Sequence, residues 1–196
     1  MNNAIEKNLA KADPPLHKII LQVAKPQIIS TTNVFHDLMS CIIEQQIHYR
    51  STKKIFHKML LTAGLEQLTP ENFHQFEEKS LSTIKLSAAK YETMLRVLEY
   101  WQTNSINWQL LSNEEVRLKL SSIKGIGHWT IDMILLYTLE RASVFPVDDY
   151  HLKKKMIALY NLDPKVKLKA RMIEISEKWK SHQSLATLYI LARKIG

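Results

Sequence analysis

The sequence is poor in cysteine, the residue of disulfides and metal clusters, and in glycine. Its 196 residues include one cysteine and four glycines. The single cysteine, Cys41, excludes an internal disulfide and any four-cysteine metal or iron–sulfur site. Cys41 has apolar neighbours on both sides in the sequence, which is typical of a core residue in a cytoplasmic protein.

Long apolar runs and β-type patterns are also absent. No apolar segment approaches the length of about 20 residues that a membrane-spanning helix needs, and the N-terminus has no apolar signal core. Alternating β-branched runs do not occur, whereas apolar residues recur at helical spacing in every long segment. We therefore predict an all-α fold and a cytoplasmic protein without a membrane partner.

Positive charge is in excess. Lysine and arginine number 27 and aspartate and glutamate 19, so the formal net charge is 27 − 19 = +8. An apolar content of 45% is enough for a core in a domain of this length. The basic balance favours a polyanionic partner, although many basic proteins never bind nucleic acid.

Capping residues and helical periodicity predict the elements along the chain. Residues 1–13 are polar and are expected to fray. The predicted helices are 16–24, one capped by residues 31–33, one ended by Gly64, a short one opened by Thr69 and Pro70, one capped by Ser87, and then 113–120, 128–139, 149–160, 165–179 and 182–194.

Two of the four glycines occur together as Gly125-Ile126-Gly127, between two predicted helices. Ser112 and Glu115 are spaced as a capping box for the helix before the pair. Paired glycines are expected where the backbone takes a positive φ or where another backbone approaches closely. The N–H groups of such a hairpin, at the start of the next helix, are suited to binding one phosphate.

This region resembles the helix-hairpin-helix motif of the DNA glycosylase superfamily that is named after this motif. Within that superfamily it is most similar to the alkylation-repair branch, 3-methyladenine DNA glycosylase II. An acidic pair, Asp148-Asp149, follows the hairpin at the family's spacing (149 − 127 = 22). The hairpin residues that carry the resemblance are Leu120, Ile123, Gly125, Ile126, Gly127, Trp129 and Thr130.

The resemblance runs from about Thr31 to the end of the chain, and it implies two helical lobes with a DNA-binding cleft between them. Residues 1–30 would supply an N-terminal helix to the terminal lobe. Residues 31–140 would form the helical bundle with the hairpin, and residues 141–196 would complete the terminal lobe. The chain resembles the compact form of the family, without an N-terminal β domain.

The resemblance implies that Asp149 is the catalytic carboxylate. Breaking an N-glycosidic bond develops positive charge on the sugar, which a carboxylate at C1′ stabilises. Asp148 is the alternative, because it matches the spacing of the oxidised-guanine branch (148 − 127 = 21). If Asp149 is catalytic, Asp148 is expected to serve as the cap of the following helix. In a non-catalytic interpretation, the acidic pair only caps that helix.

Further residues acquire expected roles from the family. Trp129 stands where bifunctional members carry a lysine nucleophile, so no Schiff base is expected. Trp129 and Tyr137 are assigned to the base pocket, although a core tryptophan that closes the hairpin is the alternative. Gln46, with His48 as the second candidate, is the expected wedge in the space left by a flipped base. The expected DNA backbone contacts are Lys124, Gly125, Ile126, Gly127, His128 and Thr130.

Two segments after the acidic pair, 153–155 and 179–186, carry further expectations. The segment from Trp179 to Ala186 resembles a family motif and keeps its serine as Ser184, but Ser181 and Gln183 replace the family's proline and arginine. The lysine run 153–155 is expected to be a solvated helix face.

The predicted function is a monofunctional DNA-3-methyladenine glycosylase that acts as a monomer on double-stranded DNA with alkylated bases. A non-catalytic helix-hairpin-helix DNA-binding protein and a glycosylase for oxidised or mismatched bases are the alternatives. No cofactor and no metal held by side chains is expected. A monovalent cation bound by the backbone carbonyls of the hairpin stays open.

Overall fold

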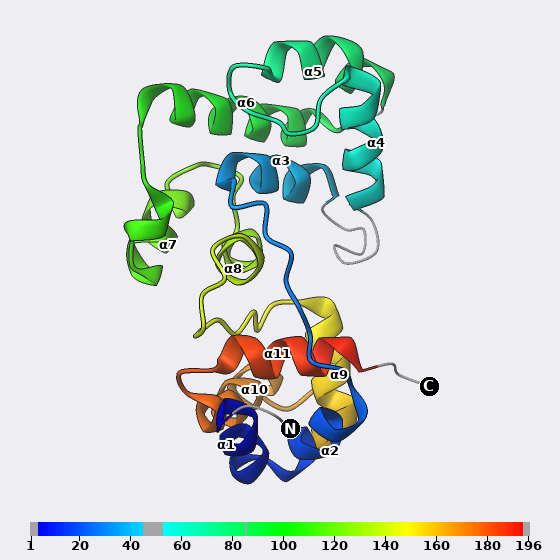
Figure 1. Ribbon diagram of the computed structural model, residues 1–196, viewed down its shortest axis with the longest axis vertical. Helices are drawn as coiled ribbons and strands as arrows, with labels where there is room; N and C mark the ends of the chain where they lie inside the picture. Colours follow the sequence, from blue (N-terminus) through cyan, green and yellow to red (C-terminus); the bar gives the residue numbers. More distant parts are fainter. Residues whose placement is uncertain (1–3, 45–52, 85, 194–196) are drawn as a thin grey trace. The chain divides into compact units, whose positions relative to one another are not determined.

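The structure is a computed structural model that describes residues 4–44, 53–84 and 86–193. The described residues form helices joined by turns and loops, and none of them forms a strand (Figure 1). The prediction of an all-α fold is therefore confirmed. Among the described helices, none combines the length and apolar character needed to cross a bilayer.

The chain forms two compact units, one from Ser30 to Ile134 and the other from Met1–Ile29 together with Leu135–Gly196. The predicted second boundary, after residue 140, is six residues later than the observed one (140 − 134 = 6). The apolar pattern of residues 128–139 has no break that would mark this boundary. In the structure, the α-helix ends at Met133 and a π-helical turn follows over Ile134–Thr138.

The unit formed by residues 30–134 is organised around one buried helix. Every residue of α3 (Val34–Glu44) is buried, and α4, α6 and α8 pack against it. Asn33 caps α3, because its Oδ1 accepts a hydrogen bond of 3.0 Å from the His36 N–H. The other helices of this unit are α4 (Lys53–Ala63), α5 (Phe73–Lys79), α6 (Ala88–Thr103), α7 (Asn113–Ser121) and α8 (His128–Met133).

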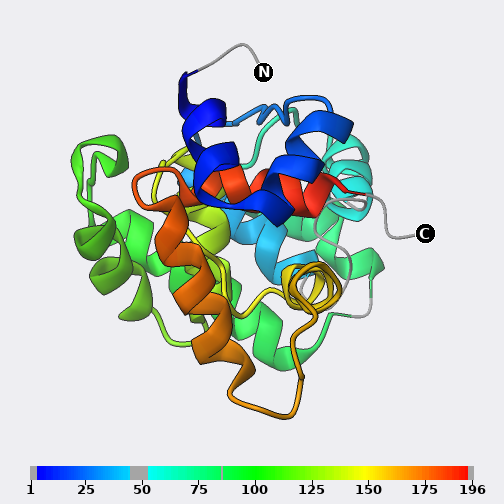
Figure 2. The ribbon, with the colours of Figure 1, turned by 90° about the horizontal axis from the view of Figure 1, so that it is seen from below.

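The second unit brings the two ends of the chain together. In this unit α2 and α9 both pack against α11 (Figures 1 and 2). Its helices are α1 (Ala4–Ala12), α2 (Pro14–Gln22), α9 (Tyr150–Tyr160), α10 (Leu168–Ser176) and α11 (Gln183–Ala192).

A buried carboxylate, Asp13, links these segments. Asp13 is 0% exposed and caps α2, with Oδ1 accepting from the Leu16 N–H at 3.0 Å. Its Oδ2 accepts from the Tyr160 hydroxyl and from Trp179 Nε1, both at 2.9 Å. Burial is the main cause that raises the pKa of Tyr160, so the phenol keeps its proton and donates to Asp13. The three bonds satisfy a charge that would otherwise be costly to bury.

Residues 4–13 are ordered, so the prediction that residues 1–13 fray is wrong for them, and residues 1–3 lie outside the described residues. Residues 4–12 form α1, in which Leu9 is buried. Glu6 is also buried, at 4% exposure, and accepts a hydrogen bond of 2.7 Å from the Tyr189 hydroxyl of α11. The segment is polar in sequence, but α2 and the turn at Glu177–Trp179 pack against α1, and α11 provides a donor for its carboxylate. A contact over 183 residues of chain leaves no local signal in the sequence.

Candidate active site: a glycine hairpin and an acidic pair

The hairpin lies between α7 and α8. The capping box at the start of α7 is present as predicted, with the Ser112 hydroxyl accepting from the Glu115 N–H and the Glu115 carboxylate accepting from the Ser112 N–H. After α7, the Ile126 N–H donates to the Ile123 carbonyl at 3.0 Å. Both isoleucines are buried, and their side chains anchor the loop to the unit.

Gly125 is required by the fold. Its φ is +104°, a conformation that costs residues with a Cβ energy. A Cβ placed on Gly125 would also lie 2.2 Å from Thr93 Oγ1 in α6. That hydroxyl is held by its own hydrogen bond of 2.8 Å to the Ala89 carbonyl. Positive φ and close approach, the two reasons expected for glycine here, therefore both apply to Gly125.

Gly127 differs from Gly125 in both respects. It is the N-cap of α8 with φ −95° and ψ 167°, which is extended backbone that any residue adopts. No atom lies within 4 Å of the position that its Cβ would occupy. The expectation of positive φ or close approach within the chain is therefore wrong for Gly127. The open space above it is available to an external group.

The other hairpin residues assigned to DNA contacts differ in exposure. Lys124 and His128 are exposed, whereas Ile126 is buried and anchors the loop. The Thr130 side chain is only 1% exposed and lies in the core rather than on the surface. The first hydrogen bond within α8 is donated by the Ile131 N–H to the Gly127 carbonyl. The N–H groups of residues 128–130 therefore belong to the first turn of the helix.

The two aromatic residues assigned to the base pocket, Trp129 and Tyr137, are both partly exposed. Trp129 is in the first turn of α8, and Tyr137 is in the π-helical turn that follows. Neither is fully buried, as a simple core residue would be. Their role as a base pocket remains a prediction.

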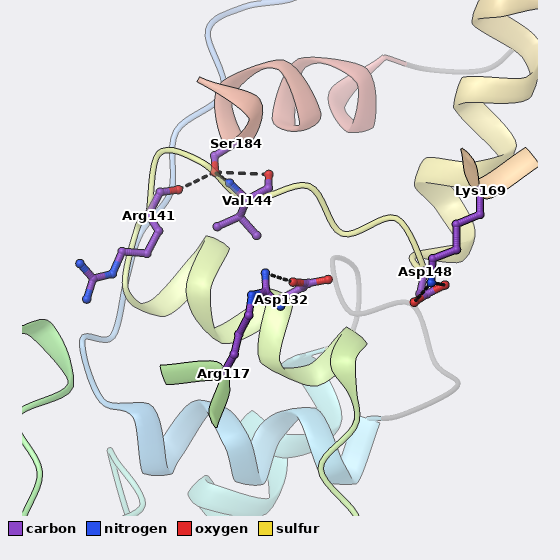
Figure 3. Close-up of polar contacts among 7 residues, drawn as sticks. All are labelled: Arg117, Asp132, Arg141, Val144, Asp148, Lys169 and Ser184. Carbon is purple, nitrogen blue, oxygen red and sulfur yellow. Dashed lines mark hydrogen bonds and ion pairs between the residues drawn. The ribbon is translucent and has the colours of Figure 1, made fainter. Parts of the chain in front are cut away.

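An ion pair joins the two helices of the hairpin motif. Arg117 Nη2 of α7 lies 2.6 Å from Asp132 Oδ1 of α8, and Asp132 is buried (Figure 3). The pair connects helices on either side of the loop and so restricts their relative position. Sequence alone did not predict this ion pair. Its only signal is an aspartate inside the otherwise apolar segment 128–139.

Asp149 is the N-cap of α9. It is 9% exposed, and its Oδ1 accepts a hydrogen bond of 2.7 Å from the Leu152 N–H. The expectation that Asp148 is the cap is therefore wrong. Because α9 begins at Tyr150, only the preceding residue has its side chain placed to reach the first-turn N–H groups. The N-terminus of α9 places the partial positive charge of its N–H groups beside the Asp149 carboxylate.

Asp148 instead forms ion pairs with two lysines. Lys169 Nζ of α10 lies 3.0 Å from Asp148 Oδ2 (Figure 3). Lys153 Nζ of α9 lies 3.4 Å from Oδ1. The hydrogen bond from Lys169 is the main cause that lowers the pKa of Asp148. The two neighbouring aspartates are thus held by different means, Asp149 by a helix end and Asp148 by cations.

The lysine run 153–155 is not a uniform solvated face, so that expectation is wrong for two of its three members. Lys153 pairs with Asp148. Lys155 Nζ donates to the Leu191 carbonyl at 2.6 Å and to the Arg193 carbonyl. Through these two bonds the lysine caps the C-terminal end of α11. Only Lys154 is exposed as predicted.

Ser184, the serine kept from the family motif, holds the loop that leads to the acidic pair. Its hydroxyl accepts a hydrogen bond of 3.0 Å from the Val144 N–H and donates to the Arg141 carbonyl (Figure 3). Its own N–H donates to the Ala142 carbonyl at 3.0 Å. The start of α11 therefore fixes residues 141–144, a few residues before Asp148.

The two wedge candidates, Gln46 and His48, lie outside the described residues, and their role stays a prediction. The described residues contain no group of three or more histidine, cysteine, aspartate or glutamate side chains that would hold a metal ion.

The chain is similar in sequence to known glycosylases. It is 28% identical over 161 residues to DNA-3-methyladenine glycosylase 1 of Schizosaccharomyces pombe, covering 80% of this chain and 70% of the relative. It is 25% identical over 203 residues to the DNA-3-methyladenine glycosylase of Bacillus subtilis, covering 93% of this chain but 64% of the relative, slightly less than two thirds. No family model matches the chain.

Solved structures share its fold over nearly the whole chain. The S. pombe 3-methyladenine DNA glycosylase, solved with abasic DNA, has a TM-score of 0.81 and 25% identity, over 96% of this chain and 95% of that one. The DNA-3-methyladenine glycosidase of Bacillus halodurans has a TM-score of 0.79 and 25% identity, over 97% and 88%. Sequence and fold therefore agree over the same long stretch: the chain is similar to DNA-3-methyladenine glycosylases, the alkylation-repair branch of the helix-hairpin-helix DNA glycosylases, in both.

Proposed function

We propose that the protein is a monofunctional DNA glycosylase that removes alkylated bases, such as 3-methyladenine or 7-methylguanine, from duplex DNA and so initiates base excision repair. One observation carries the proposal. Asp149 is a largely buried carboxylate at the N-terminus of α9, at the family's spacing from the hairpin. The names of its glycosylase relatives support the substrate class.

The chemistry needs one carboxylate. A purine alkylated at N3 or N7 is already cationic, so it leaves without a general acid. The C1′–N bond breaks, its electron pair neutralises the leaving base, and the sugar becomes an oxocarbenium ion that the Asp149 carboxylate stabilises. A water oxygen then bonds to C1′, and its proton passes to Asp149 or to solvent. The product is an abasic site in an intact strand.

The hairpin serves a different part of the task. Its N–H groups and the exposed side chains of Lys124 and His128 are suited to a DNA phosphate. The open space over Gly127 lets a phosphate approach the main chain. Trp129 carries no amine, so the position at which bifunctional members carry their lysine supplies no nucleophile for a Schiff base. Its indole is suited to stacking on a cationic base, where cation–π attraction favours the lesion.

Release of bases from methylated DNA tests the proposal. DNA treated with a methylating agent is incubated with the protein, and the released bases are separated by chromatography. We expect methylated purines from the wild type and about 10²–10³-fold slower release by Asp149→Asn. Binding without release would favour the non-catalytic alternative. Release of bases only from a parallel sample of oxidised DNA would favour the oxidised-base alternative.

A further inference from the structure

The ion pairs of Asp148 bring together more positive than negative charge. Lys153 and Lys169 come from two helices, and both ammonium groups lie within 3.4 Å of this one carboxylate. The sum of the three charges is +2 − 1 = +1. A surface ion pair contributes little to stability, so a second lysine at one carboxylate is not explained by folding alone.

The lysines remain accessible while they are paired. The Lys169 side chain is 58% exposed, the Lys153 side chain 34% and the Asp148 side chain 36%. An ammonium group has three donors, so a lysine that binds one carboxylate oxygen keeps donors for an oxygen from solvent or a ligand. The cluster can therefore accept an anion without losing its internal contacts.

The cluster is also next to the proposed catalytic carboxylate. Asp148 directly precedes Asp149, and the Lys153 N–H donates to the Asp149 carbonyl at 2.9 Å. Two aspartates that face a DNA strand repel its phosphates. Cations beside them offset this repulsion and attract the strand.

We propose that Lys153 and Lys169, held by Asp148, form a binding site for a DNA backbone phosphate beside Asp149. The inference rests on the proposed function, because it takes DNA as the ligand. Asp148 is a positioning residue in this site: it holds a lysine of α9 and a lysine of α10 at one point. The site is separate from the hairpin, whose exposed basic groups are Lys124 and His128.

The salt dependence of DNA binding tests the site. Each phosphate that is neutralised adds about 0.9 to the slope of log K against log salt, so a fourfold rise in salt weakens binding about 3.5-fold through this one contact. The cluster has a net charge of +1, so removing either lysine cancels that charge. Affinity for a duplex with a tetrahydrofuran abasic-site analogue is measured by fluorescence anisotropy between about 50 and 200 mM KCl. We expect Lys169→Met and Lys153→Met each to lower the slope by about 0.9.

Lys154→Met is the matched control, since it removes the same charge from the same helix at an exposed position outside the cluster. Its slope should change less than that of Lys169→Met or Lys153→Met. Asp148→Asn keeps both lysines and one side-chain oxygen that can accept from them, so it should keep the slope and bind DNA at least as tightly. Asp148→Leu has no acceptor to hold the lysines together, so it should lower the slope. The site is refuted if Lys169→Met and Lys153→Met have the slope of Lys154→Met, or if Asp148→Asn loses the slope as they do.

The experiments distinguish a protein without the phosphate site from a protein without glycosylase activity. Base release by the wild-type protein tests the function and does not depend on the salt slope. If the wild-type protein releases methylated purines and all lysine variants have the same salt slope, the proposed function stands and the phosphate site does not. A protein that releases no base, but loses slope only in the Lys153 and Lys169 variants, has the site without the activity.

Discussion

The two glycines of the hairpin should be separable by mutation, because the fold requires only one of them. At Gly125, a Cβ costs about 1–2 kcal/mol for the positive φ. Its contact of 2.2 Å with Thr93 Oγ1 adds overpacking, which typically costs about 1–3 kcal/mol. Gly125→Ala should therefore destabilise the protein by about 2–5 kcal/mol in denaturant unfolding, a substantial part of the stability of an ordinary domain.

Gly127→Val should leave the protein folded. Its extended backbone accepts a β-branched residue, and nothing lies within 4 Å of the new Cβ. We expect a stability change within about 1 kcal/mol, since the poorer N-cap and the stiffer unfolded chain act in opposite directions. The added side chain fills the space through which a phosphate would approach. Loss of a hydrogen bond to a charged group is about 1.5–3 kcal/mol, so DNA affinity should fall about 10–100-fold.

A double mutant provides the internal control. Thr93→Ala removes the two side-chain atoms closest to the Gly125 Cβ position, at 2.2 and 2.8 Å. It should recover most of the overpacking part of the Gly125→Ala cost, because only Thr93 Cβ, at 3.0 Å, stays close, and it should leave the positive-φ part. The reasoning is refuted if Gly127→Val unfolds as easily as Gly125→Ala. It is equally refuted if folded Gly127→Val binds every duplex with wild-type affinity.

Three further predictions concern the second unit and the product. Asp149→Asn should slow single-turnover base release about 10²–10³-fold at nearly unchanged melting temperature, because asparagine also caps helices; equal rates would show that the carboxylate is only structural. With Trp129 in the hairpin, the product strand should stay uncut until alkali is added, and a borohydride-trapped adduct would contradict this. Asp13→Ala should lower the free energy of unfolding by about 3 kcal/mol or more, because it leaves Tyr160 and Trp179 without their acceptor; a loss below about 1 kcal/mol would show that water replaces the carboxylate.

The sequence predicted well those features that depend on neighbouring residues. The capping box of Ser112 and Glu115, the Ser87 cap of α6 and the end of α4 at Gly64 are all present. Each depends on a side chain and a backbone within a few residues of each other, so spacing alone identifies it. The spacing of the hairpin and the acidic pair, together with the family resemblance, was enough to predict the superfamily.

Features that depend on distant residues were decided only by the tertiary structure. The sequence showed that Asp148 and Asp149 are adjacent, but which one caps α9 depends on where that helix begins. Which one meets cations depends on α10, which brings Lys169 to Asp148 from 21 residues away. The need for Gly125, but not Gly127, to lack a side chain likewise depends on Thr93 in another helix. A single sequence records residue identities and local spacing, whereas these contacts arise only when separate helices pack together.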